Sequence, residues 1–198
     1  MKRIVLVILI VGAAYFVYSK WFKADDNNTD NNSTQPLTAT INSGVFNTSF
    51  DRLLTSYYSL KDGLVEEDTV KVNAAAVQMV QYADSLALDE IKGDSTGDIK
   101  NTALNFTGTI SGSSKALAAE PGIEAKRREF EMITDALYNL IRVVRYDGNK
   151  VYYLFCPMAF DDKGAYWLSN EAQIRNPYFG KKMLTCGNVA DSLDYRSN

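Results

Sequence analysis

The chain has 198 residues, 46% of them hydrophobic, and it contains no histidine, which excludes Ser-His-Asp and Cys-His catalysis and histidine metal sites. Its formal net charge is −3, but residues 1–23 hold four of the 21 Lys and Arg residues and no Asp or Glu, so the remaining residues carry a formal charge of −7. An acidic domain without a basic stripe is a poor nucleic-acid binder, because contacts to phosphate dominate that affinity.

The N-terminal segment is predicted to anchor the chain in a membrane. Lys2 and Arg3 precede residues 4–22, which approach the length of about 20 apolar residues that a bilayer-spanning helix needs. We therefore predict an uncleaved signal-anchor over residues 1–23. The alternative is a cleaved signal peptide with its small-residue site at residues 12–14 (GAA). In either case we expect the globular part in the periplasm, and with the anchor retained a single-pass inner-membrane protein.

A flexible linker and one domain follow the anchor. Residues 24–40 are rich in Asn, Asp and Thr, and such a tract buries too little apolar surface to offset the entropy lost on ordering. Residues 41–198 are long enough for one domain with its own core.

The first half of this domain is predicted to form two helices. Apolar residues recur at helical spacing over residues 46–60, with Asn47 or Ser49 as the N-terminal cap. A second helix is predicted from near Thr69 to Leu86. Its inner face is predicted to consist of Val70, Ala74, Val77, Val80 and Ala83.

Two further helices complete the helical region. A third, weaker helix is predicted from about Ile99 to Ala118, broken up by Gly108 and Gly112, and a fourth begins near Pro121. Residues 126–129 (KRRE) are predicted to be an exposed face of the fourth helix. Four amphipathic helices with short connections predict a mainly α protein, an antiparallel up-down four-helix bundle. The apolar stripe of the fourth helix consists of Phe130, Ile133, Leu137, Leu140, Ile141 and Val144.

The pattern changes after residues 147–149 (DGN), which are a turn signal. Residues 151–155 (VYYLF) are typical of a β-strand, and a loop-rich stretch with turn residues at 176–178 (NPY) follows. We therefore expect a small irregular α/β appendage packed on the bundle. Asp161 and Asp162 are predicted to lie in a solvated turn.

Four sulfur-bearing residues of this appendage are candidate metal ligands. Cys156 and Met158 are two apart at the end of the predicted strand, and Met183 and Cys186 are three apart, a spacing that places both on one face of a helical turn. Thiolates and thioethers select soft ions, so copper(I) is the expected metal and silver(I) a second candidate. Zinc usually takes more Cys or His than this chain offers.

The same region resembles a known family, a bacterial domain of unknown function numbered three-three-four-seven in its series. That domain is found alone or fused to periplasmic adaptor subunits of copper/silver-type heavy-metal efflux pumps. The resemblance is strong over about residues 150–190 and looser over the helices, and it implies copper or silver handling with the four sulfur residues as ligands. The segments that carry it are residues 153–159 (YLFCPMA), 163–169 (KGAYWLS), 171–180 (EAQIRNPYFG) and 182–187 (KMLTCG).

These observations favour a free-standing metal-binding accessory domain, with a heavy-metal efflux complex or another envelope protein as its partner. The alternative is a non-catalytic interaction module in which a Cys156–Cys186 disulfide closes the 30-residue excursion and stabilises it by about 3–4 kcal/mol. A thiol-redox protein fits less well, because no Cys-x-x-Cys is present. Met79 and Met132 are predicted to fill the core. No phosphate-binding glycine loop or nucleophile elbow is recognisable, so we expect no enzyme.

Overall fold

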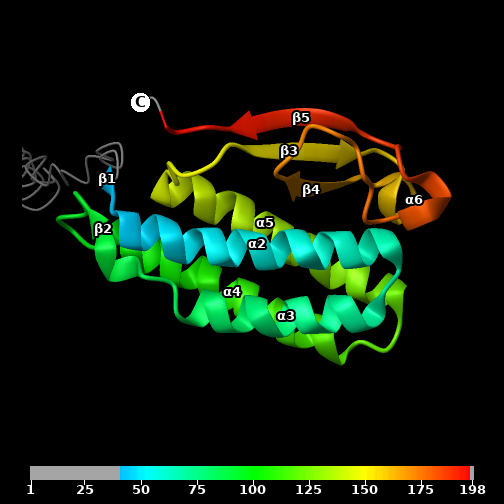
Figure 1. Ribbon diagram of the computed structural model, residues 1–198, viewed down its shortest axis with the longest axis horizontal. Helices are drawn as coiled ribbons and strands as arrows, with labels where there is room; N and C mark the ends of the chain where they lie inside the picture. Colours follow the sequence, from blue (N-terminus) through cyan, green and yellow to red (C-terminus); the bar gives the residue numbers. More distant parts are fainter. Residues whose placement is uncertain (1–40, 197–198) are drawn as a thin grey trace, which may run out of the picture. The chain divides into compact units, whose positions relative to one another are not determined.

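The computed structural model describes residues 41–196 (Figure 1). The predicted signal-anchor over residues 1–23 and the linker over residues 24–40 lie outside the described residues. Among the helices of residues 41–196, none combines the length and the apolar character needed to cross a bilayer.

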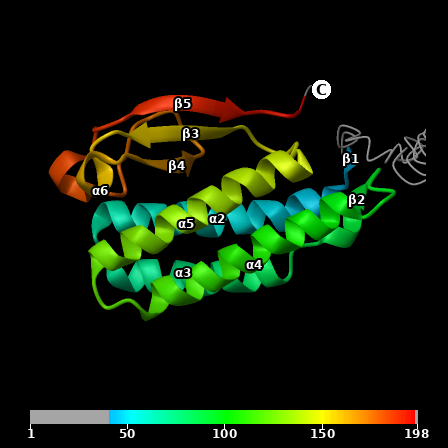
Figure 2. The ribbon, with the colours of Figure 1, turned by 180° about the vertical axis from the view of Figure 1, so that it is seen from behind.

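Four main helices pack together and confirm the mainly α prediction (Figures 1 and 2). Only Glu67 and Asp68 separate the first two, and Glu67 takes a left-handed conformation (φ 60°) that turns the chain back. A short two-stranded pair, β1 (Ile41–Asn42) with β2 (Ile91–Lys92), lies at the opposite end of the helices, where β1 leads into α2 and β2 precedes α4. The helices are α2 (Gly44–Glu66), α3 (Thr69–Asp84), α4 (Asp98–Ala119) and α5 (Ile123–Val144).

The stripes predicted for α2 and α5 are buried. Tyr57 of α2 stacks on Phe130 of α5 with ring centroids 5.1 Å apart, and its hydroxyl lies 2.7 Å from the Thr134 hydroxyl. The cap of α2 is Ser43 rather than Asn47 or Ser49, since the Ser43 side chain accepts a hydrogen bond from the Phe46 amide. The fully buried residues of the α5 stripe are Phe130, Ile133, Leu137, Leu140, Ile141 and Val144.

The inner face predicted for α3 was wrong for four of its five residues. Val70 and Val77 are 78% and 63% exposed, and only Ala83 of the predicted set is buried. The reason is the close approach of α2, where a Cβ on Gly63 would lie 2.8 Å from Val72 Cγ2. This contact places Val72 at the interface with α2, so the buried face of α3 is rotated away from the one that Val70 and Val77 define. The buried residues of α3 are Val72, Ala75, Ala76, Met79 and Ala83.

Three other expectations are corrected by packing. The third helix is continuous, because Gly108 and Gly112 lie on its exposed side while Ile110 and neighbouring residues are buried. Met132 is 52% exposed and does not fill the core, in contrast to Met79, which is fully buried as predicted.

The run of residues 126–129 is an exposed face only in part, since Arg128 is exposed but Lys126 and Arg127 are each 1% exposed. The Lys126 ammonium donates to Asn73 Oδ1 at 2.7 Å and to the Leu117 carbonyl at 2.8 Å. These partners come from α3 and α4, so the burial depends on tertiary contacts and not on local pattern.

The C-terminal appendage contains an ordered sheet, where an irregular structure was expected. Its strands pair antiparallel in the order β4-β3-β5, and β3 aligns Cys156 with Ala165 of β4. The Tyr57 hydroxyl accepts a hydrogen bond from the Leu168 amide at 3.0 Å, which connects α2 to β4. The elements are β3 (Val151–Cys156), α6 (Ala159–Asp162), β4 (Ala165–Ser169), η2 (Gly180–Met183) and β5 (Asn188–Leu193).

Candidate metal centre

The two thiols predicted to meet do so. Cys156 is the last residue of β3 and is fully buried, whereas Cys186 follows η2 and is half-buried. Their Sγ atoms lie 3.6 Å apart, and both cysteines are free thiols. The fold thus places two sulfurs from positions 30 residues apart in direct contact.

A buried asparagine holds the segment that carries Cys186. Asn176 is fully buried, and its Nδ2 donates to the Cys186 carbonyl at 2.8 Å. Its Oδ1 accepts from the backbone amides of Tyr178 at 2.8 Å and Phe179 at 3.3 Å. The turn predicted at residues 176–178 is present, but no sequence pattern indicated that its asparagine also positions a cysteine.

A glycine lets the same segment pass close to the sheet. Gly187 has a φ of +133°, and a Cβ there would lie 2.7 Å from the Phe155 carbonyl oxygen and 2.8 Å from Trp167 Cη2. No larger residue fits without moving the strand. Just before it, the Cys186 amide donates to the Met183 carbonyl at 3.1 Å and forms a turn. Asn176 and Gly187 together place Cys186 against the end of β3.

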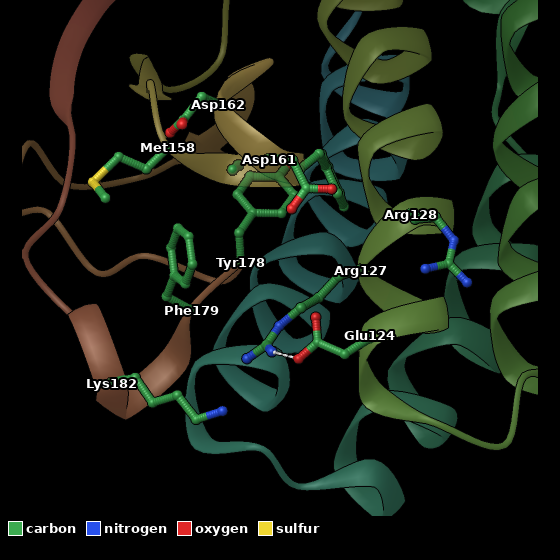
Figure 3. Close-up of a pocket in the computed structure, with 11 residues that line it drawn as sticks. Glu124, Arg127, Arg128, Met158, Asp161, Asp162, Tyr178, Phe179 and Lys182 are labelled. Atoms are coloured by element: carbon green, nitrogen blue, oxygen red, sulfur yellow. Dashed lines mark hydrogen bonds and ion pairs between the residues drawn. The ribbon is translucent and has the colours of Figure 1, made fainter.

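The two thioethers are not joined to the thiols. Met158 follows the end of β3 in a right-handed helical conformation (φ −94°, ψ −6°), so the strand alternation that would align it with Cys156 stops. Its side chain is 44% exposed, and its sulfur points away from Tyr178 in Figure 3. Met183 is half-buried at the end of η2. Within residues 41–196, no hydrogen-bond contact connects either thioether to Cys156 or Cys186.

The surroundings of Cys186 favour its protonated form, and the number of nearby ligands limits the choice of metal. Burial, together with the neighbouring Cys156 thiol, raises the pKa of the Cys186 thiol above its ordinary value. In the part of the chain that the structure describes, no three His, Cys, Asp or Glu side chains gather as a metal-binding group. The pair therefore suits an ion that accepts two soft ligands better than a four-coordinate ion such as zinc.

A pocket of about 580 Å³ lies next to Met158, between the first turns of α5 and the appendage (Figure 3). Three cationic and three anionic side chains line it, so it has no strong net charge. The Arg127 Nη1 donates to Glu124 Oε1 at 2.5 Å, and Arg127 Nε donates to the Pro177 carbonyl at 2.8 Å. Asp161 and Asp162 reach it from a left-handed turn, which agrees with the predicted solvated turn. The six charged residues are Glu124, Arg127, Arg128, Asp161, Asp162 and Lys182.

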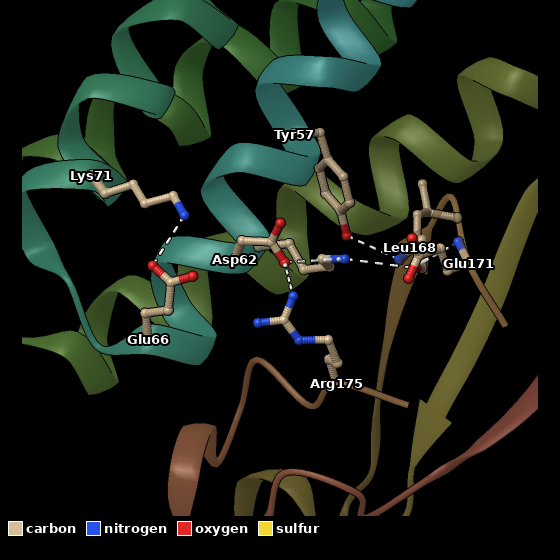
Figure 4. A network of polar contacts seen from close by, with 9 residues as sticks. Tyr57, Asp62, Glu66, Lys71, Leu168, Glu171 and Arg175 are labelled. Carbon is tan, nitrogen blue, oxygen red and sulfur yellow. Dashed lines mark hydrogen bonds and ion pairs between the residues drawn. The ribbon is translucent and has the colours of Figure 1, made fainter. Parts of the chain in front are cut away.

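A second polar cluster fixes the loop after β4 to α2 (Figure 4). The Lys61 ammonium is buried and lies 3.4 Å from Asp62 Oδ1 and 3.5 Å from the Ser169 hydroxyl. Asp62 also pairs with Arg175 at 3.4 Å. Burial lowers the pKa of Lys61 despite these carboxylate contacts, as expected for an ammonium taken out of water. This cluster holds Arg175, the neighbour of Asn176, in place.

Comparison with known proteins identifies a family. No curated protein and no solved structure matches the chain. The family described as "Protein of unknown function (DUF3347)" matches residues 53–147, which extend from within α2 to the turn after α5. The expected family is thus confirmed, but the match covers the helices, and the sulfur-bearing residues 156–186 lie outside it. The chain contains a DUF3347 domain over residues 53–147.

Proposed function

We propose that this protein binds one soft monovalent ion, copper(I) or silver(I), between Cys156 and Cys186. The observation that carries the proposal is the 3.6 Å contact between two free thiols in a protein without histidine. Two deprotonated thiols and one monovalent cation form a unit with a single negative charge. Thiolate ligands select copper(I) over hard ions such as calcium or magnesium.

The separation of the thiols suits an ion placed between them. With metal–sulfur bonds of about 2.3 Å, two sulfurs stand about 3.8 Å apart at a tetrahedral angle and about 4.6 Å apart when linear. The observed 3.6 Å therefore needs to widen by about 1 Å or less. Cys186 is the side chain to move, because it lies on a turn while Cys156 belongs to a paired strand. The exposed Met158 and the half-buried Met183 are the candidate third ligands, and their side chains would rotate toward the ion.

The cellular role proposed with this site is that of a periplasmic accessory domain for heavy-metal efflux. A basic, then apolar N-terminus supports an inner-membrane anchor through residues 4–22, and the acidic remainder supports export. The helices, proposed to be an antiparallel up-down bundle, serve as the rigid support for the sheet that carries Cys156. The partner is an efflux complex or another envelope protein that exchanges the ion with this domain.

The test is a competition titration of the anaerobically reduced protein with a copper(I) chelator. Cys156→Ser and Cys186→Ser are expected to lose most of the affinity, and Met158→Leu and Met183→Leu a smaller part. Met132→Leu is the matched control, because this methionine is exposed on α5 and is not one of the four proposed ligands. If all variants titrate like the wild type, the proposal fails.

The alternative function, an interaction module with a structural disulfide, is distinguished by counting free thiols. Protein isolated without reductant and without air has two free thiols if they are metal ligands, and copper(I) protects both. A native disulfide that persists, together with indifference to copper(I), would support the interaction module.

A further inference from the structure

The two thiols of the pair differ in access. Cys156 Sγ belongs to a residue with no exposed surface, at the end of a strand paired on both sides. Cys186 lies on a turn and is partly exposed. Cys186 is therefore the residue of the pair that a reagent from solution can approach, and its Sγ lies 3.6 Å from the Cys156 Sγ.

We propose that the pair exchanges with disulfides, with Cys186 as the attacking thiol and Cys156 as the resolving thiol. The absence of Cys-x-x-Cys argued against redox chemistry at the level of sequence. That motif serves to keep two sulfurs within reach of each other, and here tertiary packing brings them into contact from 30 residues apart. The substrate class is an accessible disulfide, of a small molecule or of a peptide.

The exchange balances in two steps. The Cys186 thiolate, its proton released to solvent, attacks one sulfur of R–S–S–R, so that a Cys186–S–S–R bond forms and RS⁻ leaves and takes up a proton. The Cys156 thiolate then attacks Cys186 Sγ, the Cys156–Cys186 disulfide forms, and the second RSH leaves. The protein dithiol loses two electrons and the substrate disulfide gains them.

The surroundings of the pair favour the second step. A disulfide requires the sulfurs to close from 3.6 Å to about 2.05 Å. Asn176 and Gly187 hold the backbone of the Cys186 segment against β3, so the mixed disulfide forms beside Cys156 and has little room to move away. A buried resolving thiol is protected from attack by external disulfides, so the order of the two steps is fixed by the fold.

This exchange would regulate the proposed metal site, and in that respect it rests on the proposed function. The disulfide consumes both thiolate ligands, so the oxidised protein cannot hold copper(I) between them. Reduced protein holds the ion and oxidised protein releases it.

The test treats reduced, full-length protein with oxidised glutathione in one arm and a disulfide-linked peptide in the other. Wild type is expected to form the Cys156–Cys186 disulfide with little lasting adduct. Cys156→Ser should accumulate a stable mixed disulfide on Cys186, and Cys186→Ser should react at least roughly tenfold more slowly through Cys156. The same two variants in denaturant should react at equal rates, which shows that the fold creates the difference. The arm that reacts identifies the source of the disulfide.

Two results would overturn the proposal: equal adduct formation by the two folded variants, or a wild type that stays reduced in both arms. Should the serine variants fold poorly, the wild type is alkylated instead with a limiting amount of reagent. Modification of Cys186 first is the expected result, and modification of Cys156 first contradicts the proposal. Copper(I) affinity is measured on the same preparations. Exchange without copper(I) binding ends the proposed function alone, and copper(I) binding without exchange ends this inference alone.

Discussion

Replacing Asn176 with alanine removes three side-chain hydrogen bonds from one fully buried position. Each such bond contributes a net of about 1 kcal/mol, and the Tyr178 amide would be left buried without a partner. We therefore expect Asn176→Ala to lower the free energy of unfolding by about 3 kcal/mol. Because the Cys186 carbonyl loses its donor, copper(I) affinity should fall as well.

Asn176→Asp is the matched variant that separates the two halves of this interaction. It keeps Oδ1 as acceptor for Tyr178 and Phe179, but an oxygen replaces the donor to the Cys186 carbonyl. Burial raises the pKa of the new carboxyl, so the stability of the variant relative to the wild type should be higher near pH 4, where the acid is neutral and donates, than at pH 7.

Urea denaturation measures both variants, at pH 4 and pH 7 beside the wild type, with the slope of the transition as a check that the compactness of the two states is unchanged. The reasoning is refuted if Asn176→Ala unfolds within about 0.5 kcal/mol of the wild type. It is equally refuted if the aspartate variant loses stability relative to the wild type as the pH falls.

Three further predictions follow from the helices and the thiols. Leu140→Ala in the core of α5 should destabilise the protein by about 2–5 kcal/mol in the same denaturation assay. Lys61→Met should leave stability at pH 7 unchanged or higher by about 1 kcal/mol, because Asp62 keeps Arg175 as its partner. Thermal melts should show the wild type gaining stability relative to Lys61→Met as the pH approaches 10.5, because the unfolded chain holds the Lys61 proton more tightly than the folded protein does. Copper(I) affinity, measured by competition, should rise about a hundredfold per pH unit below the thiol pKa values, because two thiols lose protons; a flat profile would argue against two thiolate ligands.

The sequence predicted the fold where large apolar residues repeat. The stripe of α5, from Phe130 to Val144, is unambiguous because leucine, isoleucine and phenylalanine occupy one face. The face of α3 was misassigned because alanine and valine occur on both of its faces, and only packing against neighbouring helices, such as Gly63 of α2 against Val72, shows which face is buried. The burial of Lys126 was unpredictable for a similar reason, since its partners lie on two other helices.

At the candidate site, the sequence predicted that the two cysteines meet, but not which residues hold them together. β5 escaped notice because four of its six residues are exposed and its polar and apolar residues do not alternate as in a half-buried strand. The alternation expected at Met158 ends because the chain leaves the strand after Cys156. Asn176 was predicted only as a turn residue. Its contact with the Cys186 carbonyl depends on how the loop between the two residues folds, which local sequence patterns do not predict.

The most direct test of the central claim is alkylation of the reduced protein with and without one equivalent of copper(I), followed by mass mapping of the modified cysteines. A metal held between the two thiols predicts that both Cys156 and Cys186 become protected together by that single equivalent. Copper(I) that leaves Cys186 as reactive as in the metal-free protein would contradict it.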